Sequence, residues 1–152
     1  MKPEIVRFEP EHLLAFDWRE FDREDCTRWT RELMRRHVSI SYTGVVDGRV
    51  LGCAGVIFVE EGRAFAWLAA SCELDRHQLW FHKTIKTYFR AIIRTCGLEY
   101  VFTWVRQDSA RNRNWIEALG FEPQADSHID DAGSVHRNYL LRTHHAITHL
   151  RT

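Results

Sequence analysis

A long helical pattern between two strand-like runs limits the fold of this chain more than any other feature. The pattern extends from Asp75 to Thr95, and Gly97 follows it at a position that favours a left-handed helix cap. Its predicted buried face consists of Leu79, Ile85, Phe89, Ile92 and Cys96. The flanking runs, Ala64–Ala70 and Tyr100–Val105, have the composition of strands. A strand, a helix and a strand in this order predict a right-handed parallel crossover.

A hairpin precedes the crossover. Ile40–Val46 and Arg49–Val59 are β-rich and are joined by Asp47-Gly48, a dipeptide typical of tight hairpin turns. Together with Ala64–Ala70 they predict an antiparallel meander.

The other predicted elements complete the order β, α, α, β, β, β, α, β, α, β, β. At the N-terminal end they are a strand at Ile5–Phe8 and a short helix opened by Glu9-Pro10. A second helix is predicted from about Asp22, with Cys26, Trp29, Leu33 and His37 on one stripe. At the C-terminal end they are a helix capped by Asp108 or Ser109 and ended by Gly120, and a last pair of strands at Phe121 and Val135–Leu141 around an irregular polar loop. This order predicts the α+β (mixed α/β) class. We expect one domain over residues 1–141 and a His-rich tail over 142–152.

Composition excludes several classes of protein. The 152 residues suffice for one core, and a hydrophobic fraction of 45% excludes a disordered chain. Lys+Arg and Asp+Glu are both 21, so a general nucleic-acid coat is not expected. The apolar window Val50–Val59 is too short to span a bilayer, and Met1–Glu4 shows no secretory signal, so no membrane insertion and a cytoplasmic location are predicted.

The cysteines and histidines offer alternatives of different chemistry. Cys26, Cys53, Cys72 and Cys96 contain no C-x-x-C pair, which favours reduced thiols. Cys72 is either an activated thiol or, on burial statistics, a buried structural residue. Among His144, His145 and His149, an i, i+4 pair suits a metal, but without further ligands the tail is expected to be solvated and no metal is predicted.

Two further segments invite functional interpretations. Gly52-Cys53-Ala54-Gly55 lies within a strand and has no following helix, so it indicates close backbone packing or a bulge rather than a phosphate loop. The arginines of the loop from Arg106 to Arg113 suit phosphate contacts, but a solvated loop is the simpler interpretation.

The segment Asn112–Pro123, with Leu119-Gly120-Phe121 at its centre, resembles the last helix and strand of the GNAT superfamily of acyl-CoA N-acyltransferases. The order of elements over nearly the whole chain resembles that fold too. The stretch from Ala66-Trp67-Leu68 through Thr103-Trp104-Val105 to Gly120 is also similar to small GNAT-like proteins of tailed phages.

The resemblance implies a site for acetyl-CoA or CoA. By position, the resemblance assigns the pantetheine arm to Leu68, Ala69, Ala70 and Ser71. It assigns the phosphates to the stretch that contains Cys72, Arg76, His77 and Gln78. Helix N-termini favour such anions because their N–H groups lack partners.

The chain departs from the family at two chemical positions. The family signature Gln/Arg-x-x-Gly-x-Gly/Ala corresponds here to Asp75-Arg76-His77-Gln78-Leu79-Trp80, which has no glycine. Gln78 and Trp80 therefore place side chains where the family keeps room. Ile116 stands where the family has a Tyr general acid, and Ser109 is the only match to its Asn at the start of that helix. Ser109 is the candidate catalytic residue.

These departures favour a GNAT-fold phage pseudoenzyme with weakened or lost acyl-CoA chemistry and a virion-associated or host-interaction role. The alternative is an active acetyl-CoA-dependent N-acetyltransferase that acts on an amine of a protein or small molecule. A protein partner of the virion or host and a homo-oligomer are compatible with the first interpretation. Its location would be the host cytoplasm or the virion.

Overall fold

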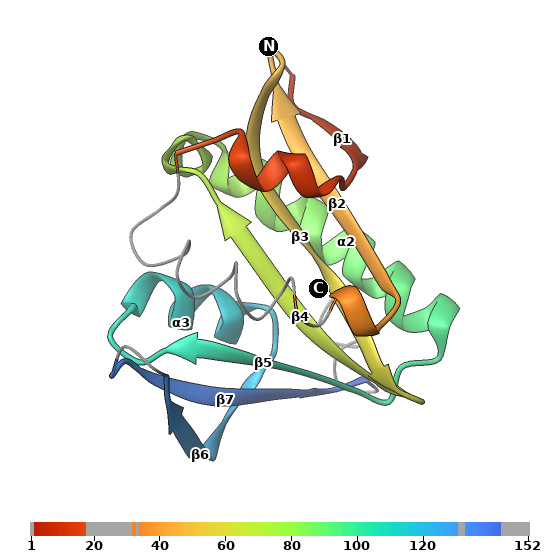
Figure 1. Cartoon of the computed structure of the whole chain (residues 1–152), viewed down its shortest axis with the longest axis vertical. Coiled ribbons are helices and arrows are strands. Elements are labelled where there is room, and N and C mark those ends of the chain that lie inside the picture. Colours follow the sequence, from red (N-terminus) through yellow and green to blue (C-terminus); the bar gives the residue numbers. More distant parts are fainter. Residues whose placement is uncertain (1, 18–31, 33, 131–132, 144–152) are drawn as a thin grey trace. The chain divides into compact units, whose positions relative to one another are not determined.

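The computed structural model describes residues 2–17, 32, 34–130 and 133–143 (Figure 1). Its elements are β1 (Glu4–Arg7), η1 (Pro10–Leu14), β2 (Ser39–Val46), β3 (Arg49–Glu60), β4 (Arg63–Ala70), η2 (Cys72–His77), α2 (Gln78–Cys96), β5 (Tyr100–Arg106), α3 (Ala110–Ala118), β6 (Glu122–Ile129) and β7 (Val135–Arg142). Most of the helix predicted from Asp22, and the tail histidines, lie outside the described residues.

The strands form one sheet in the order β1-β2-β3-β4-β5-β7-β6. The pair β4 and β5 is parallel, with Arg63–Phe65 in register with Tyr100–Phe102, and α2 connects the two strands. The predicted parallel crossover and the α+β class are therefore confirmed. None of the described helices is long and apolar enough to cross a bilayer.

The chain divides into two compact units. Unit 1 consists of Met1–Val59 and Ala66–Ile85, and unit 2 consists of Glu60–Phe65 and Lys86–Thr152. Each unit is described by itself below.

The hairpin of unit 1 follows the predicted turn. Asp47 has φ 51° and Gly48 has φ 75°, the positive values that a two-residue hairpin turn requires at both positions. Behind this turn β2 and β3 pair in antiparallel register, as predicted, with Ser41 opposite Gly55. The helical turn η1, red in Figure 1, begins at Pro10 and is a 3-10 helix.

Glycines in β3 allow close backbone packing, as predicted for this segment. A Cβ at Gly52 would lie 2.8 Å from the backbone oxygen of Ala69. A Cβ at Gly55 would lie 2.5 Å from the oxygen of Ile40 and would overlap the hydroxyl of Ser41. Any larger residue at these positions must push a neighbouring strand away.

The end of α2 in unit 2 also follows the sequence. Gly97 has φ 62°, and the N–H of Leu98 donates to the oxygen of Ile93 at 3.2 Å, which is the long bond of a Schellman cap. Phe89 stacks on Phe121 with ring centroids 5.9 Å apart, so the helix packs on the start of β6.

The predicted buried face of α2 is partly wrong. Phe89 and Ile92 are buried, but Leu79 is 70% exposed, Cys96 is exposed, and Phe81 is buried instead. With 3.6 residues per turn, Leu79 lies about 80° from Phe89 around the helix and about 140° from Ile92. The prediction also merged two helix types, because residues 72–77 form a 3-10 helix.

The prediction for the C-terminal segment needs two corrections. The last pair of strands is present as predicted, but its first strand, β6, is longer than expected and occupies most of the loop predicted between Phe121 and Val135, at the edge of the sheet. Its register shifts between Pro123 and Ser127, and most of its side chains are exposed, so no apolar alternation marked it in the sequence. Arg142, which was assigned to the tail, is the last residue of β7.

Candidate functional site

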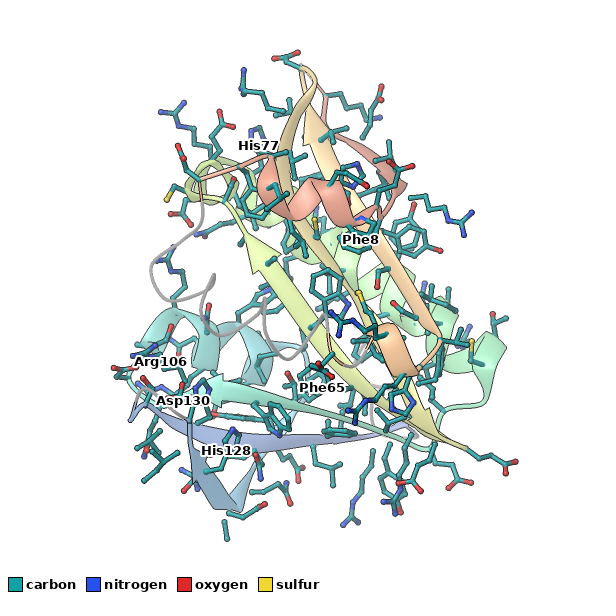
Figure 2. All side chains as sticks on the ribbon, viewed as in Figure 1. Phe8, Phe65, His77, Arg106, His128 and Asp130 are labelled. Atoms are coloured by element: carbon teal, nitrogen blue, oxygen red, sulfur yellow. The ribbon has the colours of Figure 1, made fainter. Side chains whose placement is uncertain are left out.

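The residues predicted to hold the cofactor follow one another at the junction of β4, η2 and α2 in unit 1. Leu68, Ala69 and Ala70 are the last residues of β4, and Ser71 precedes η2. Cys72, Arg76 and His77 belong to η2, and Gln78 is the first residue of α2. We call this stretch, residues 68–78, the β4–α2 junction. His77 is labelled there in Figure 2.

The first part of the junction is anchored by backbone hydrogen bonds. The N–H of Ser71 donates to the oxygen of Leu51 at 2.9 Å, and the N–H of Leu74 donates to the oxygen of Ser71 at 3.1 Å. Ser71 is 2% exposed, yet its Oγ has no hydrogen-bond partner among the described residues. A buried hydroxyl without a partner is uncommon and suits a site that a ligand completes.

The chain enters α2 without a loop. Gln78 has helical backbone angles (φ −55°, ψ −44°) and directly follows the last residue of η2. Ser71 is the N-cap of η2 and makes no side-chain cap bond. The two positions that the resemblance assigns to the family glycines, Gln78 and Trp80, therefore lie in the first turn of α2.

The acidic side chains of the junction are engaged by neighbours. Arg49 contacts Glu73 with both Nη2 to Oε1 at 2.9 Å and Nε to Oε2 at 3.2 Å. Gln78 donates from Nε2 to Oδ1 of Asp75 at 3.3 Å. The Arg49 pair offsets the charge of Glu73, and the Gln78 amide gives Asp75 a polar neighbour.

The basic side chains of the junction are available to an anion. Arg76 is exposed and His77 is half-buried, and neither has an ion-pair or hydrogen-bond partner among the described residues. The helix that follows contains no Asp or Glu. Its charged residues are the cations Lys83, Lys86, Arg90 and Arg94.

Trp80 packs on the sheet of unit 1. A Cβ at Gly44 in β2 would lie 3.3 Å from Cη2 of Trp80, so the end of the indole covers this glycine. The ring has a packing partner in β2, which the sequence did not indicate.

Ser109 caps α3 in unit 2, as predicted. Its Oγ accepts a hydrogen bond from the N–H of Asn112 at 3.4 Å. Ile116 is 7% exposed and belongs to the core, so no acid stands at the position of the family tyrosine. Burial raises the pKa of Tyr139 in β7, and the carboxylate of Glu117 adds to this rise.

The other sequence candidates have simpler roles. Arg106 pairs with Asp108 at 3.0 Å and only 11% of its side chain is exposed, which weakens the predicted basic loop. Cys72 is exposed, so its interpretation as a buried residue is wrong. Burial raises the pKa of the Cys53 thiol to about 11. Cys53, Cys72 and Cys96 form no disulfide, as expected for reduced thiols.

One polar cluster was missed in the sequence. His136 Nε2 lies 3.0 Å from Oδ2 of Asp130, and the ring of His128 stacks on that of His136. Figure 2 labels His128 and Asp130 at the β6 end of unit 2. Alternate residues of two paired strands carry these side chains, but the strand predicted at Phe121 did not extend to His128, so the sequence did not show this pattern. No group of three metal-ligating residues suited to a metal occurs in the described part of the chain.

Solved structures share this fold. The ribosomal-protein-S18-alanine N-acetyltransferase from Escherichia coli matches with TM-score 0.65 and 15% identity, over 93% of this chain and 94% of that chain. Ard1 from Thermoplasma volcanium matches with TM-score 0.72 and 16% identity, over 92% and 97%. A GNAT-family protein from Desulfovibrio desulfuricans matches with TM-score 0.67 and 15% identity, over 93% and 99%.

No family model matches the sequence, and neither does any curated protein. The similarity therefore lies in the structure, and the fold of this chain is that of the GNAT acetyltransferases.

Proposed function

We propose that this protein is an acyl-CoA-dependent N-acyltransferase of the GNAT type, which holds the cofactor at the β4–α2 junction. The observation that carries the proposal is the charge arrangement of the junction. Glu73 is paired with Arg49, whereas Arg76 and His77 have no partner among the described residues. An arginine binds phosphates strongly, because hydrogen bonds between charged groups are the strong ones, and an imidazole N–H can donate a further hydrogen bond.

The residues present fit coenzyme A by charge, although the glycine cradle is missing. Arg76 and His77 would hold the phosphates, and the stretch Leu68–Ser71 would hold the pantetheine arm. The unsatisfied Oγ of Ser71 supplies a hydrogen-bonding group in this stretch. When bound, acyl-CoA supplies an activated thioester.

The acyl transfer itself involves few protein groups. The amine nitrogen bonds to the acyl carbon, the carbon–sulfur bond breaks, the amine loses a proton and the sulfur gains one. Ile116 cannot provide that proton. The Ser109 hydroxyl uses a lone pair in the helix cap and keeps its hydrogen, so we propose that Ser109 gives this proton to the leaving sulfur and regains one from water, while the proton of the amine passes to water.

Calorimetric titration with acetyl-CoA and CoA tests the proposal. We expect micromolar binding by the wild type and a loss of about tenfold or more in Arg76→Glu, because charge is reversed beside the phosphates. Asp75→Asn should tighten binding, because it removes a negative charge. The matched control is Arg142→Glu, an exposed arginine in unit 2. Equal weakening by both charge reversals would contradict the assigned site.

Ser109 is tested by two substitutions. Ser109→Asn keeps an N-cap residue and a donor, whereas Ser109→Ala removes both and costs about 1 kcal/mol of stability. We expect transfer activity to be retained by Ser109→Asn and to fall in Ser109→Ala with unchanged CoA affinity. Equal activity of the two variants would remove Ser109 from the reaction.

A second candidate function is supported by the missing glycines and the buried Ile116. We propose as the alternative that acyl-CoA chemistry is weakened or lost and that the fold serves a phage virion or host-interaction role. In that case the partner is a virion or host protein, and the chain acts in the host cytoplasm or within the virion. Absence of CoA binding by the wild type, with binding gained in Gln78→Gly, would support this candidate.

A further inference from the structure

A row of basic side chains runs along the part of α2 that belongs to unit 2. Lys86, Arg90 and Arg94 follow one another at steps of four residues. With about 3.6 residues and a rise of about 5.4 Å per turn, successive members lie about 40° apart around the helix and about 6 Å apart along it. We call these three residues the basic row of α2, the helix drawn in green in Figure 1.

The opposite side of this part of α2 is buried, which fixes the orientation of the row. Phe89 stacks on Phe121, and Ile93 is 2% exposed. Lys86 lies about 20° from Ile93 around the helix and is half-buried, whereas Arg94 is exposed. The row therefore begins at the border of the core and turns toward solvent.

The positive charge of the row is not balanced by carboxylates on the same helix. α2 contains no Asp or Glu, and none of the three cations has an ion-pair partner among the described residues. Carboxylates elsewhere in unit 2 are engaged by other groups. Glu60 pairs with Arg63 at 3.5 Å, and the side chain of Glu99 lies against Gly62.

The helix dipole accounts for only one member of the row. Arg94 lies in the last turn of α2, where the partial negative charge of the helix end favours a cation. Lys86 and Arg90 lie further from the end, and the effect of the dipole falls off within the last turn. These two cations therefore have no counterpart in the helix itself and are available to an external anion.

We propose that the basic row binds an acidic segment of a partner protein, with carboxylates on every second residue of an extended stretch. Such carboxylates lie on one side of the segment at intervals of about 6.6 Å, close to the step of the row. An arginine pairs with a carboxylate through two parallel hydrogen bonds, which favours this partner at Arg90 and Arg94. The net charge of zero gives the chain no long-range attraction for a nucleic acid, which favours a short protein segment. The inference involves no residue of the β4–α2 junction and does not depend on the proposed function.

Backbone NMR with a short peptide tests the inference. The probe is acetyl-Glu-Ala-Glu-Ala-Glu-amide, added to ¹⁵N-labelled protein at low ionic strength. We expect the N–H signals of residues 86–94 to shift and to saturate in the millimolar range, because each exposed ion pair contributes little. The corresponding peptide with Lys in place of Glu should leave these signals unchanged. Equal shifts with both peptides would overturn the proposal.

A peptide of the same composition tests the spacing. In acetyl-Glu-Glu-Glu-Ala-Ala-amide the three carboxylates no longer share one side of an extended segment, so we expect binding to weaken severalfold. Equal affinity of the two acidic peptides would overturn the alternate-residue arrangement.

Variants assign the effect to the row. We expect Arg90→Glu to weaken binding of the acidic peptide at least about fivefold, and Lys86→Glu to act in the same direction. Arg90→Lys keeps the charge and should retain most of the affinity. Arg142→Glu, which alters an exposed arginine at the end of β7, is the matched control and should bind as the wild type does. Equal weakening in Arg90→Glu and Arg142→Glu would contradict the assignment to the row.

An oligonucleotide separates protein from nucleic acid as the partner. A strand of about ten thymidine nucleotides should bind no more tightly than the acidic peptide at the same ionic strength, because the chain as a whole does not attract a polyanion. Tighter binding of the oligonucleotide at the signals of residues 86–94 would overturn the protein partner.

Discussion

Two groups of polar side chains in the sheet of unit 1 are closed by their own hydrogen bonds, whereas the polar group around His128 and Asn138 in unit 2 leaves acceptors without partners among the described residues. In unit 1, His12 Nδ1 lies 2.8 Å from Oγ1 of Thr43, which lies 3.4 Å from Sγ of Cys53. Nδ1 also accepts from the N–H of Glu9 at 3.1 Å, so this chain of contacts ties η1 to β2 and β3. Thr43 and Cys53 are both 0% exposed.

A second closed group lies on the same strands. Trp67 donates from Nε1 to Oγ of Ser41 at 3.0 Å, and Oγ of Ser39 lies 2.6 Å from the same oxygen. Phe8, labelled in Figure 2, contacts the Trp67 ring edge-on at 5.1 Å. Closed groups of this kind stabilise the fold, because each polar atom keeps a partner after burial.

The group around His128 and Asn138 in unit 2, which we call the histidine cluster, differs in that both residues keep acceptors without partners among the described residues. In unit 1 the comparable open group is Ser71, which belongs to the proposed cofactor junction. The difference indicates that closed polar groups in this chain stabilise the fold, whereas open ones add little to its stability. Substitutions in the two kinds of group should therefore differ in their effect on the free energy of unfolding.

The largest effect is expected for Gly55→Ala in unit 1. The new methyl group would meet the backbone of Ile40 at 2.5 Å and disturb Ser41, so the free energy of unfolding should fall by about 3 kcal/mol. Urea denaturation followed by Trp fluorescence measures this change. Gly97→Ala is the control: it meets nothing within 4 Å and is strained only by its φ of 62°, so it should cost about 1 kcal/mol. Equal losses of unfolding free energy in the two variants would show that the close approach of β2 and β3 at Gly55 does not limit stability.

Alkaline pH should weaken unit 1 through Cys53. Burial raises the pKa of this thiol from 9.0 to about 11, so between these values the unfolded chain loses the proton and the native chain keeps it. This contribution to stability is therefore fully present below pH 9 and is lost as pH rises through 11, by about 2.7 kcal/mol in total. Urea denaturation from pH 8 to 11 measures the slope. Cys53→Ala should lack this component, and an unchanged slope in that variant would contradict the assignment.

A smaller loss of unfolding free energy is expected when the hydroxyl of Thr43 is removed from the group formed with His12 and Cys53. Thr43→Val keeps the shape but removes the hydroxyl between His12 and Cys53, which should cost about 1 kcal/mol. Thr43→Ser retains the hydroxyl and serves as the control in the same denaturation experiment. If the serine variant retained no part of this contribution, the hydrogen bonds would not be the source of the stability.

The smallest effect is expected in the histidine cluster. Asn138→Leu removes a buried amide oxygen that has no partner, which is favourable, and the exposed hydrogen bond from Nδ2 to Asp126, which is unfavourable, so the free energy of unfolding should change by less than about 0.5 kcal/mol. Urea denaturation of this variant beside Thr43→Val measures the change. A cost as large as that of Gly55→Ala would show that the cluster is structural and would break the comparison.

Local chemistry in the sequence predicted the parts of the fold that depend on neighbouring residues. The Asp47-Gly48 turn, the Gly97 cap and the Ser109 cap were all predicted correctly, because each depends on one or two residues whose conformation or hydrogen bonding is specific. Leu79 was misplaced because it lies about 80° from Phe89 and about 140° from Ile92 around α2, outside the buried face.

The candidate sites were only partly accessible to the same reasoning. The resemblance identified the stretch Leu68–Gln78 as a candidate site. It did not predict which charges of the stretch are paired, because Arg49, the partner of Glu73, lies 24 residues away in the chain. The histidine cluster escaped notice because β6 is an edge strand without apolar alternation.

Hydrophobic period and turn chemistry act over a few residues, and for this reason the sequence was enough to predict the order of the strands, the parallel crossover and the Asp47-Gly48 turn. Only the tertiary structure decided which charges are paired, which thiol is buried and which histidines stack. These properties depend on contacts between residues far apart in the chain, and neither spacing nor composition encodes the distance between them.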